Sequence, residues 1–374
     1  MYIINIIFLI KLFFSFSFFF LNVTFYFLCI HEGKNRVMKY EINYIFRKYN
    51  KININNIYKK YNPTKEKKNE TIKSTIHIEF TLDPDFILET MLTITSIMAS
   101  QEKTTKIVFH FGVIKNFKAE YMIKIFSLKN KINNLTDFNF YYLIGAMKKM
   151  KNFHKKGEAC PGKFELPQLL PDNIEKILLF DAGDVIVIKD LTKLYNYNMK
   201  NYWILGLPEP ICLNYVKKYN ITKYLNIGAL IINVTEFKKN NIWDKYTKNR
   251  NLYLMGAVDQ TLLNIIIPDD KKDYFPFSLG IYSIFKKEDR FYSKNYYDYG
   301  LESWLASNSN NLPNNPRTIS EYFSLINTSI FIHQFEGKWY NGEGLSLCRN
   351  SSKYFIKLAG IWEELCSKRP GYCQ

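Results

Sequence analysis

A strand, a helix and a second strand follow one another between Ile76 and Phe111. Residues 76–82 and 106–111 are rich in β-branched and aromatic side chains, and apolar residues recur at helical spacing over residues 87–98. Asp83-Pro84 supplies a capping acid and a proline at the first helical position. This order is typical of a βαβ unit. The sequence therefore predicts an α/β fold, with a mainly parallel sheet flanked by helices on both faces.

Two aspartates follow the most apolar strand. Residues 177–180 are Ile-Leu-Leu-Phe, the next four are Asp181-Ala-Gly-Asp184, and a second apolar run covers residues 185–188. Carboxylates at the end of a strand buried on both faces are costly unless they are paired, protonated or bound to a cation. In open α/β sheets, ligands bind beyond the carboxyl ends of the strands. We therefore expect a metal site for a phosphorylated substrate here.

Further elements follow from the same patterns. We expect a helix that begins at Asp259, and the remaining predicted elements are a helix over residues 119–130 and strands over 138–142, 203–206, 225–233 and 329–333.

The N-terminal part differs in composition from the rest. Residues 12–30 carry no charge and are long enough to cross a bilayer, which favours a membrane anchor within residues 1–30, with a cleaved signal peptide as the alternative. A third interpretation is that translation begins at Met38. Residues 31–74 are rich in Asn and Lys and predict a stem or linker. We expect the folded domain over residues 75–345 and a tail over 346–374.

Charge does not indicate a nucleic-acid partner. The 374-residue chain has a formal net charge of +17, and about half of it lies between Lys34 and Lys73, within the predicted linker. Blocks of like charge in such a stretch are typical of a solvated segment. We therefore predict no nucleic-acid binding.

Four motifs occur in an order that resembles glycosyltransferase family 8, the retaining nucleotide-sugar transferases that include glycogenin-like enzymes and bacterial galactosyl- and glucosyltransferases. They are the first strand with Asp83; the acidic strand end with Val185-Ile186-Val187 and Asp190-Leu191; Leu225-Asn-Ile-Gly-Ala-Leu-Ile-Ile-Asn233; and Asp259-Gln260, followed by His333 with Gly337-Lys338.

The resemblance implies a GT-A fold, which is Rossmann-like, and a divalent metal on the diphosphate of a UDP-sugar donor. Asp181, Asp184 and His333 are the implied metal ligands, and carboxylate with imidazole suits Mn²⁺ first and Mg²⁺ next. The two aspartates are separated by two residues instead of the family's one. Asp184 aligns with the second family aspartate, and Asp181 fits only if Gly183 turns the backbone so that both carboxylates converge.

The resemblance also assigns a donor site and a reacting centre. Asp259 and Gln260 lie near the anomeric carbon, where Asp259 binds sugar hydroxyls. Lys163 stands where relatives have an arginine, and a lysine keeps the charge without the planar fork. The donor-binding set is Thr81, Leu82, Asp83, Lys163, Asn226, Gly228, Gly337 and Lys338.

The sequence thus predicts a retaining hexosyl- or pentosyltransferase that uses a UDP-sugar and a glycan, protein or lipid acceptor. The alternative is a non-catalytic relative that binds a nucleotide or glycan, and a nucleotidyltransferase is disfavoured because no Gly-rich phosphate loop precedes the first helix. An anchor at residues 12–30 implies a single-pass type II protein of the secretory pathway, in the Golgi, whereas a start at Met38 implies a cytoplasmic protein.

Overall fold

The computed structural model divides the chain into two compact units, Met1–Glu66 and Lys67–Gln374. It describes residues 51–53, 71–114, 117–132, 135–149, 160–208, 218–249, 251–252, 259–283, 321, 324–325, 328–334, 354–355, 357–360, 363–364 and 367. Strand β1 (Lys51–Asn53) belongs to the first unit. All further description concerns the second unit.

Strands and helices alternate along the first part of the second unit, as the βαβ pattern predicts. The elements up to residue 200 are β2 (Ser74–Leu82), η1 (Pro84–Phe86), α3 (Ile87–Ser100), β3 (Thr105–Val113), α4 (Ala119–Lys131), β4 (Thr136–Tyr142), α5 (Ile144–Lys149), η2 (Cys160–Phe164), α6 (Leu166–Leu169), β5 (Lys176–Phe180), β6 (Val185–Val187) and α7 (Thr192–Tyr195). The later elements are β7 (Ile204–Pro208), β8 (Leu225–Asn233), α9 (Val234–Lys239), α10 (Ile242–Lys248), α12 (Asp259–Ile266), η3 (Asp269–Lys271), β9 (Lys272–Tyr274), β10 (Gly280–Ser283) and β11 (Phe331–Gln334).

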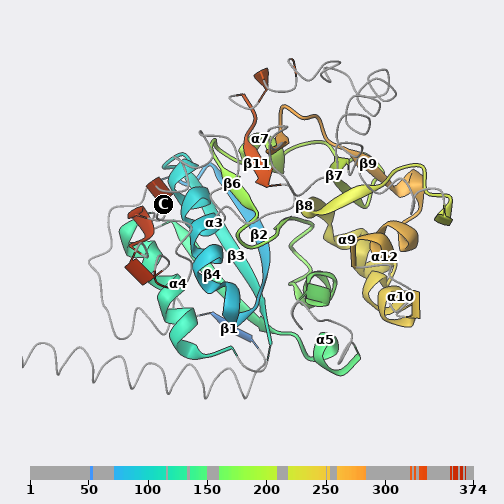
Figure 1. Ribbon diagram of the computed structural model, residues 1–374, viewed down its shortest axis with the longest axis horizontal. Coiled ribbons are helices and arrows are strands. Elements are labelled where there is room, and N and C mark those ends of the chain that lie inside the picture. The colour runs from blue at the N-terminus through green and yellow to red at the C-terminus, as the bar shows by residue number, and fades with distance from the viewer. Residues whose placement is uncertain are drawn as a thin grey trace, which may run out of the picture. The chain divides into compact units, whose positions relative to one another are not determined.

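The main sheet places these strands in the order β4-β3-β2-β5-β8-β7-β9 (Figure 1). Strands β4, β3, β2 and β5 run parallel to one another, and β7 runs parallel to β9. Strand β8 is antiparallel to both β5 and β7. The expectation of an α/β fold with a mainly parallel sheet is confirmed, with β8 as the reversed strand.

Helices α3 and α4 cover one face of the β2–β3–β4 half of the sheet (Figure 1). That face is aromatic: Phe80, Phe109 and Phe138 lie in stacked or tilted contact, and Phe126 of α4 packs edge-on against Phe138. All four side chains are at most 2% exposed. Rings in these offset and edge-to-face arrangements add to the stabilisation that apolar burial supplies.

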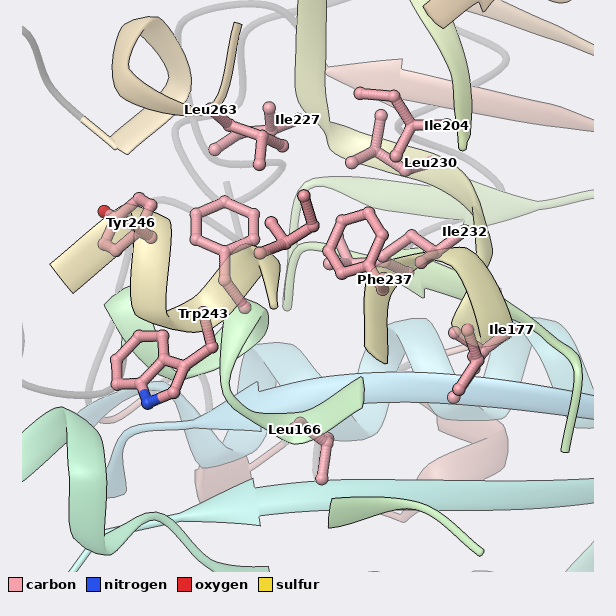
Figure 2. Packing of buried hydrophobic residues seen from close by; sticks show 14 of the residues in the cluster. Leu166, Ile177, Ile204, Ile227, Leu230, Ile232, Phe237, Trp243, Tyr246 and Leu263 are labelled. Carbon is pink, nitrogen blue, oxygen red and sulfur yellow. The ribbon is translucent and has the colours of Figure 1, made fainter. Parts of the chain in front are cut away.

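The other half of the sheet packs against α6, α9, α10 and α12. Figure 2 shows Leu230 and Ile232 of β8 beside Phe237 of α9, and Ile177 of β5 and Trp243 of α10 belong to the same buried cluster. This cluster fixes α12 relative to β8. Because α12 begins with Asp259 and Gln260 and β8 contains Asn226 and Gly228, the same packing brings two predicted site segments together.

A second sheet holds β11 beside the acidic turn. Its order is β10-β11-β6, in which β11 is parallel to β10 and antiparallel to β6, with His333 opposite Val185. Polar side chains of α3 hold β6 in place: Val187 N–H donates to Ser96 Oγ at 3.1 Å, and Ser100 Oγ donates to Val187 C=O at 2.9 Å. The sequence predicted β11 as a late strand but not this sheet.

Within the described ranges, the structure has no helix that combines the length and the apolar character of a membrane span. The predicted anchor at residues 12–30, the alternative start at Met38 and most of the predicted linker lie outside the described residues.

Candidate functional site

The carboxyl ends of β2 and β5 lie at the same edge of the main sheet because the two strands are parallel neighbours. Strand β8 runs the opposite way, so its early residues lie at that same edge. The backbone confirms this closeness, since Asp181 N–H donates to Gly228 C=O at 2.8 Å. Four predicted site positions, Asp83, Asp181, Asn226 and Gly228, therefore lie at the edge where α/β sheets bind ligands.

A tight turn joins β5 to β6 and carries both aspartates. Gly183 has φ +79°, and Asp184 N–H donates to Asp181 C=O at 3.4 Å, a pattern typical of a type II turn with glycine at its third position. Helix α3 anchors the turn, because Gly183 N–H donates to Thr93 Oγ1 at 3.1 Å. The two-residue spacing of the aspartates is therefore accommodated by a reversal at Gly183 instead of a continuous strand.

Three polar side chains point at one spot above Gly228. A Cβ placed on Gly228 would lie 2.2 Å from His333 Nε2, 3.0 Å from Asn226 Oδ1 and 3.2 Å from Asp181 Oδ2. Glycine leaves room for this convergence, as strand glycines do where a ligand approaches. Asp181 and His333, far apart in sequence, thus present a carboxylate oxygen and an imidazole nitrogen to the same small space.

Lys163 joins this space to the start of α12. Its Nζ lies 2.8 Å from Asp181 Oδ1 and 3.5 Å from Asp259 Oδ2, and its side chain is 4% exposed. Asp181 therefore uses one carboxylate oxygen for Lys163 and directs the other toward the spot above Gly228. A buried cation shared by two carboxylates offsets part of their desolvation cost and fixes their separation.

Asp259 and Gln260 form the first turn of α12. Gln260 Oε1 accepts a hydrogen bond from Ile227 N–H at 3.3 Å, which places its amide beside the Asn226–Gly228 segment. Asp259 reaches Lys163 and is 14% exposed. Thus Lys163 and the Ile227 backbone connect the two predicted catalytic residues to the acidic turn and to β8.

Glu79 is a fully buried acid on the central strand β2. Within the part of the chain that the structure describes, neither of its carboxylate oxygens has a hydrogen-bond partner. Burial raises the pKa of Glu79 well above its usual value, and the charge of Lys163 lowers it only in part. Burial therefore favours the protonated form of Glu79.

The remaining predicted residues have separate positions. Thr81 and Leu82 end β2, and Asp83 caps η1 by accepting from Asp85 N–H at 3.1 Å. Gly337 and Lys338 lie outside the described residues. In the described part of the chain, no three His, Cys, Asp or Glu side chains form a metal-binding group. The structure therefore brings Asp181 and His333 together, and ligation by Asp184 stays a prediction.

The family model for glycosyl transferase family 8 matches residues 77–273, just over half of the chain. The chain belongs to glycosyltransferase family 8. The matched residues include Asp181, Asp184, Asn226, Asp259 and Gln260, so the resemblance that the motifs indicated is confirmed.

Curated relatives of this family 8 member are distant. Probable galacturonosyltransferase-like 4 of Arabidopsis thaliana is 21% identical over 215 residues, which is 50% of this chain and 60% of that protein. General stress protein A of Bacillus subtilis is 26% identical over 126 residues, which is 32% of this chain and 44% of that protein. The chain spans less than two thirds of the length of these relatives.

Solved structures establish the fold. Galactosyltransferase LgtC, in complex with donor and acceptor sugar analogs, superposes with a TM-score of 0.55 at 15% identity, covering 76% of this chain and 95% of that chain. The bifunctional glycosyltransferase WbbM superposes with a TM-score of 0.58 at 15% identity, covering 80% of this chain and 52% of that chain. This family 8 chain therefore has the fold of known glycosyltransferases, as expected for GT-A.

Sequence reasoning missed two features of the site. Glu79 lies in an alternating strand, where an acid between apolar residues usually faces solvent, but here both faces of β2 are covered. Thr93, Ser96 and Ser100 lie three and four residues apart on helix α3, and all three form hydrogen bonds to the acidic turn or to β6. That polar stripe was the signal available in the sequence.

Proposed function

We propose that this family 8 protein is a retaining transferase that moves a hexosyl or pentosyl group from a UDP-sugar to a glycan, protein or lipid acceptor. In this proposal a divalent metal, Mn²⁺ first and Mg²⁺ next, lies on the donor diphosphate. One observation carries it: Asp181 Oδ2, His333 Nε2 and Asn226 Oδ1 converge on Gly228, beside Lys163 and the first turn of α12.

The side chains at this spot fit such a metal. Imidazole nitrogen and carboxylate oxygen together suit Mn²⁺, and diphosphate oxygens complete such a set in many nucleotide sites. When bound, the metal neutralises the charge that develops on the departing UDP. Asp181 and His333 are the residues that would hold it, and Asp184 is the further ligand that the motif implies.

The chain's own residues then divide the remaining work. Lys163 holds Asp181 and Asp259 with its ammonium group, so that the metal ligand and the sugar-binding acid keep a fixed separation. In this proposal Asp259 binds a sugar hydroxyl, and the Gln260 amide lies beside Asn226 and Gly228. These polar groups are set in place by the fold before substrate arrives, which is how preorganised sites stabilise developing charge.

Hydrolysis of UDP-sugars tests the proposal. The purified chain is incubated with Mn²⁺, or with EDTA, and a panel that includes UDP-glucose, UDP-galactose, UDP-xylose and UDP-galacturonic acid, the last because of the plant relatives' names. We expect metal-dependent release of UDP from at least one donor. Metal-dependent UDP binding without turnover of any donor would favour the non-catalytic alternative.

Two variants then separate the ligands. Asp184→Ala and Asp181→Asn are each expected to abolish metal-dependent turnover, whereas Asp270→Asn, at a carboxylate that is 71% exposed, is expected to leave it unchanged. Unchanged turnover in Asp184→Ala would remove that residue from the ligand set.

We further propose a membrane anchor at residues 12–30 and a lumenal catalytic domain in the secretory pathway, in the Golgi. The apolar, uncharged sequence of these residues supports the proposal. Protease protection of a C-terminal tag in microsomes is the test, and digestion without detergent would favour a cytoplasmic domain.

A further inference from the structure

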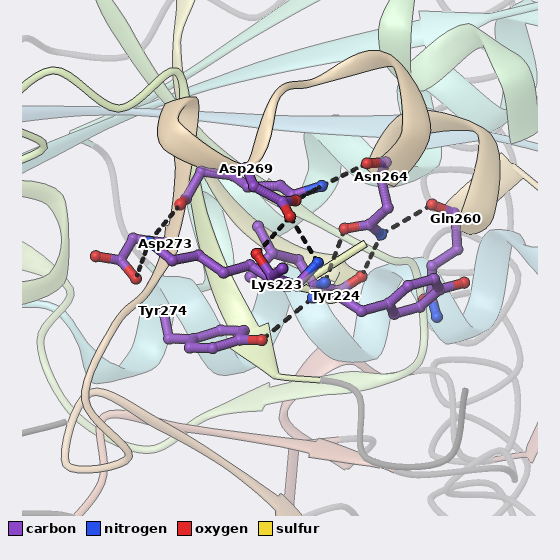
Figure 3. Close-up of polar contacts among 10 residues, drawn as sticks. Lys223, Tyr224, Gln260, Asn264, Asp269, Asp273 and Tyr274 are labelled. Carbon is purple, nitrogen blue, oxygen red and sulfur yellow. Dashed lines mark hydrogen bonds and ion pairs between the residues drawn. The ribbon is translucent and has the colours of Figure 1, made fainter. Parts of the chain in front are cut away.

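Helix α12 reaches the site only by its first turn, which carries Asp259 and Gln260. The helix therefore needs a fixed register against the start of β8, where Asn226 and Gly228 lie. A network of buried polar contacts lies between the two elements and continues into β9 (Figure 3). Apart from Gln260, its members were not among the residues that the motifs assigned to the site.

Asn264 pairs α12 with β8 directly. Its Oδ1 accepts from Leu225 N–H at 2.8 Å, and its Nδ2 donates to Leu225 C=O at 2.8 Å and to Gln260 C=O at 2.9 Å. The Asn264 amide thus bonds both backbone groups of Leu225, as a neighbouring strand would, and also bonds the carbonyl of Gln260. The side chain is 1% exposed, so these bonds face no competition from water.

Lys272 binds the backbone carbonyl of Asn264. The carbonyl of Asn264 would ordinarily accept from the N–H four residues later, but that residue is Pro268, which has none. Lys272 Nζ donates to this carbonyl instead, and its side chain is 0% exposed. A cation at the C-terminal end of a helix is also favoured by the helix dipole.

A carboxylate and a hydroxyl residue keep the buried cation in position. Asp269 Oδ1 lies 2.9 Å from Lys272 Nζ, and Asp269 Oδ2 accepts from Thr222 N–H at 2.6 Å. Thr222 lies three residues before β8 begins, so the network starts and ends at the same segment of the chain. Burial lowers the pKa of Lys272, and Asp269 raises it in part.

We propose that Asn264 and Lys272 are positioning residues for the reaction: through Asn264, the buried ammonium of Lys272 fixes the register of α12 against β8, and so the placement of Asp259 and Gln260 beside Asn226. The inference rests on the proposed transferase function for its kinetic consequence. Its structural part, that the Lys272 contact protects the hydrogen bonds of Leu225 and Ile227, stands without turnover.

The test compares Lys272→Met with Lys271→Met. Methionine keeps about the length of the side chain and removes the charge. Lys271 is a neighbouring lysine that is 34% exposed and forms an ion pair with Asp270. Hydrogen exchange by mass spectrometry over residues 224–228 reports the bonds from Leu225 and Ile227 to α12. Steady-state hydrolysis of the best UDP-sugar and binding of UDP with Mn²⁺ report the site.

For Lys272→Met we expect at least about tenfold faster exchange over residues 224–228, kcat lower by about 10- to 100-fold, and UDP affinity within about threefold of the parent. Lys271→Met is expected to match the parent in all three. Unchanged exchange would overturn the proposal, and so would an unchanged kcat in a folded variant that exchanges faster. A loss of UDP affinity as large as the loss of kcat would also overturn it. If the parent turns over no donor, the transferase proposal fails, while hydrogen exchange still tests the register of α12 against β8.

Asp269→Asn is the substitute variant if Lys272→Met does not fold. It removes the counterion and retains the lysine, and we expect changes in the same direction.

Discussion

Substitution of Gly228 by alanine tests the convergence of the proposed metal-binding side chains without replacing any of them. The added methyl would lie 2.2 Å from His333 Nε2, and ordinary contact begins at 3.4 Å, so the ring must recede by about 1 Å. His333 is 6% exposed and lies in a strand paired on both sides, which leaves few directions for that movement. Asp181 Oδ2 and Asn226 Oδ1 are crowded as well.

The expected loss follows from the tolerance of metal sites. Ligand distances hold within about 0.2 Å of their ideal values, so a displacement of about 1 Å removes a ligand. Even indirect disturbance of ligands typically costs about 10- to 100-fold in affinity. We therefore expect the gain in UDP affinity that Mn²⁺ provides to fall by at least about tenfold, together with about 1–3 kcal/mol of stability from overpacking.

Titration calorimetry of UDP with and without Mn²⁺ measures this gain, and urea unfolding measures stability. Gly112→Ala is the matched control: its methyl would meet Leu143 Cδ1 at 2.8 Å, an apolar side-chain end on the same sheet. That variant should lose stability and keep the Mn²⁺ effect. A folded Gly228→Ala protein with an unchanged Mn²⁺ effect would refute the placement of the metal at this spot.

Three further predictions concern buried charges. Because the pKa of Glu79 is raised, its contribution to stability is full below the unfolded pKa of about 4.5 and is lost as the pH rises. In urea unfolding at pH 8, Glu79→Gln should therefore be more stable than the parent, and the difference should shrink toward pH 4. Equal stabilities of the two proteins at pH 8 would contradict this. Burial, with the nearby Lys106, lowers the pKa of His77 to about 4, so the contribution of His77 to folding stability is full above the unfolded pKa of 6.5 and is lost as the pH falls toward 4. His77→Gln should therefore reduce the loss of stability between these pH values by roughly 1–2 kcal/mol, allowing for partial exposure. Lys163→Met leaves Asp181 and Asp259 without their shared cation and should cost about 3 kcal/mol by the same measurement, while Lys163→Arg should retain most of the stability; a neutral Lys163→Met would show that the ion pairs contribute nothing net.

Much of the fold follows from periodicity. The spacing of apolar residues over 87–98 and the apolar run at 177–180 correspond to α3 and β5, and the order of strands and helices predicted the mainly parallel sheet. The reversed direction of β8 was not predictable in this way, because a strand buried on both faces has the same apolar sequence pattern whether it is parallel or antiparallel to its neighbours. The pairing of β6 with β11 joins segments more than 140 residues apart, and no local pattern specifies such a partner.

The sequence predicted several residues of the candidate site, but it did not predict the contacts between them. Asp181 and His333 were assigned from the family motifs, and their approach at Gly228 depends on the second sheet. The ion pair from Lys163 to Asp181 and Asp259 depends on the packing of η2 beneath β2, which the sequence does not specify. Lys272 reads as one of several surface lysines in the sequence, and only the fold shows that it is buried at the end of α12.

The most direct test of the proposed metal-dependent transferase site is the initial rate of UDP release from the best donor at saturating Mn²⁺, compared between the parent chain and Asp181→Asn. The carboxamide keeps the size of the side chain and removes the negative charge that faces both Lys163 and the spot above Gly228. We predict Mn²⁺-dependent turnover that falls by at least about 100-fold in the variant. Equal rates in the two folded proteins, or turnover that EDTA leaves unchanged, would contradict this account.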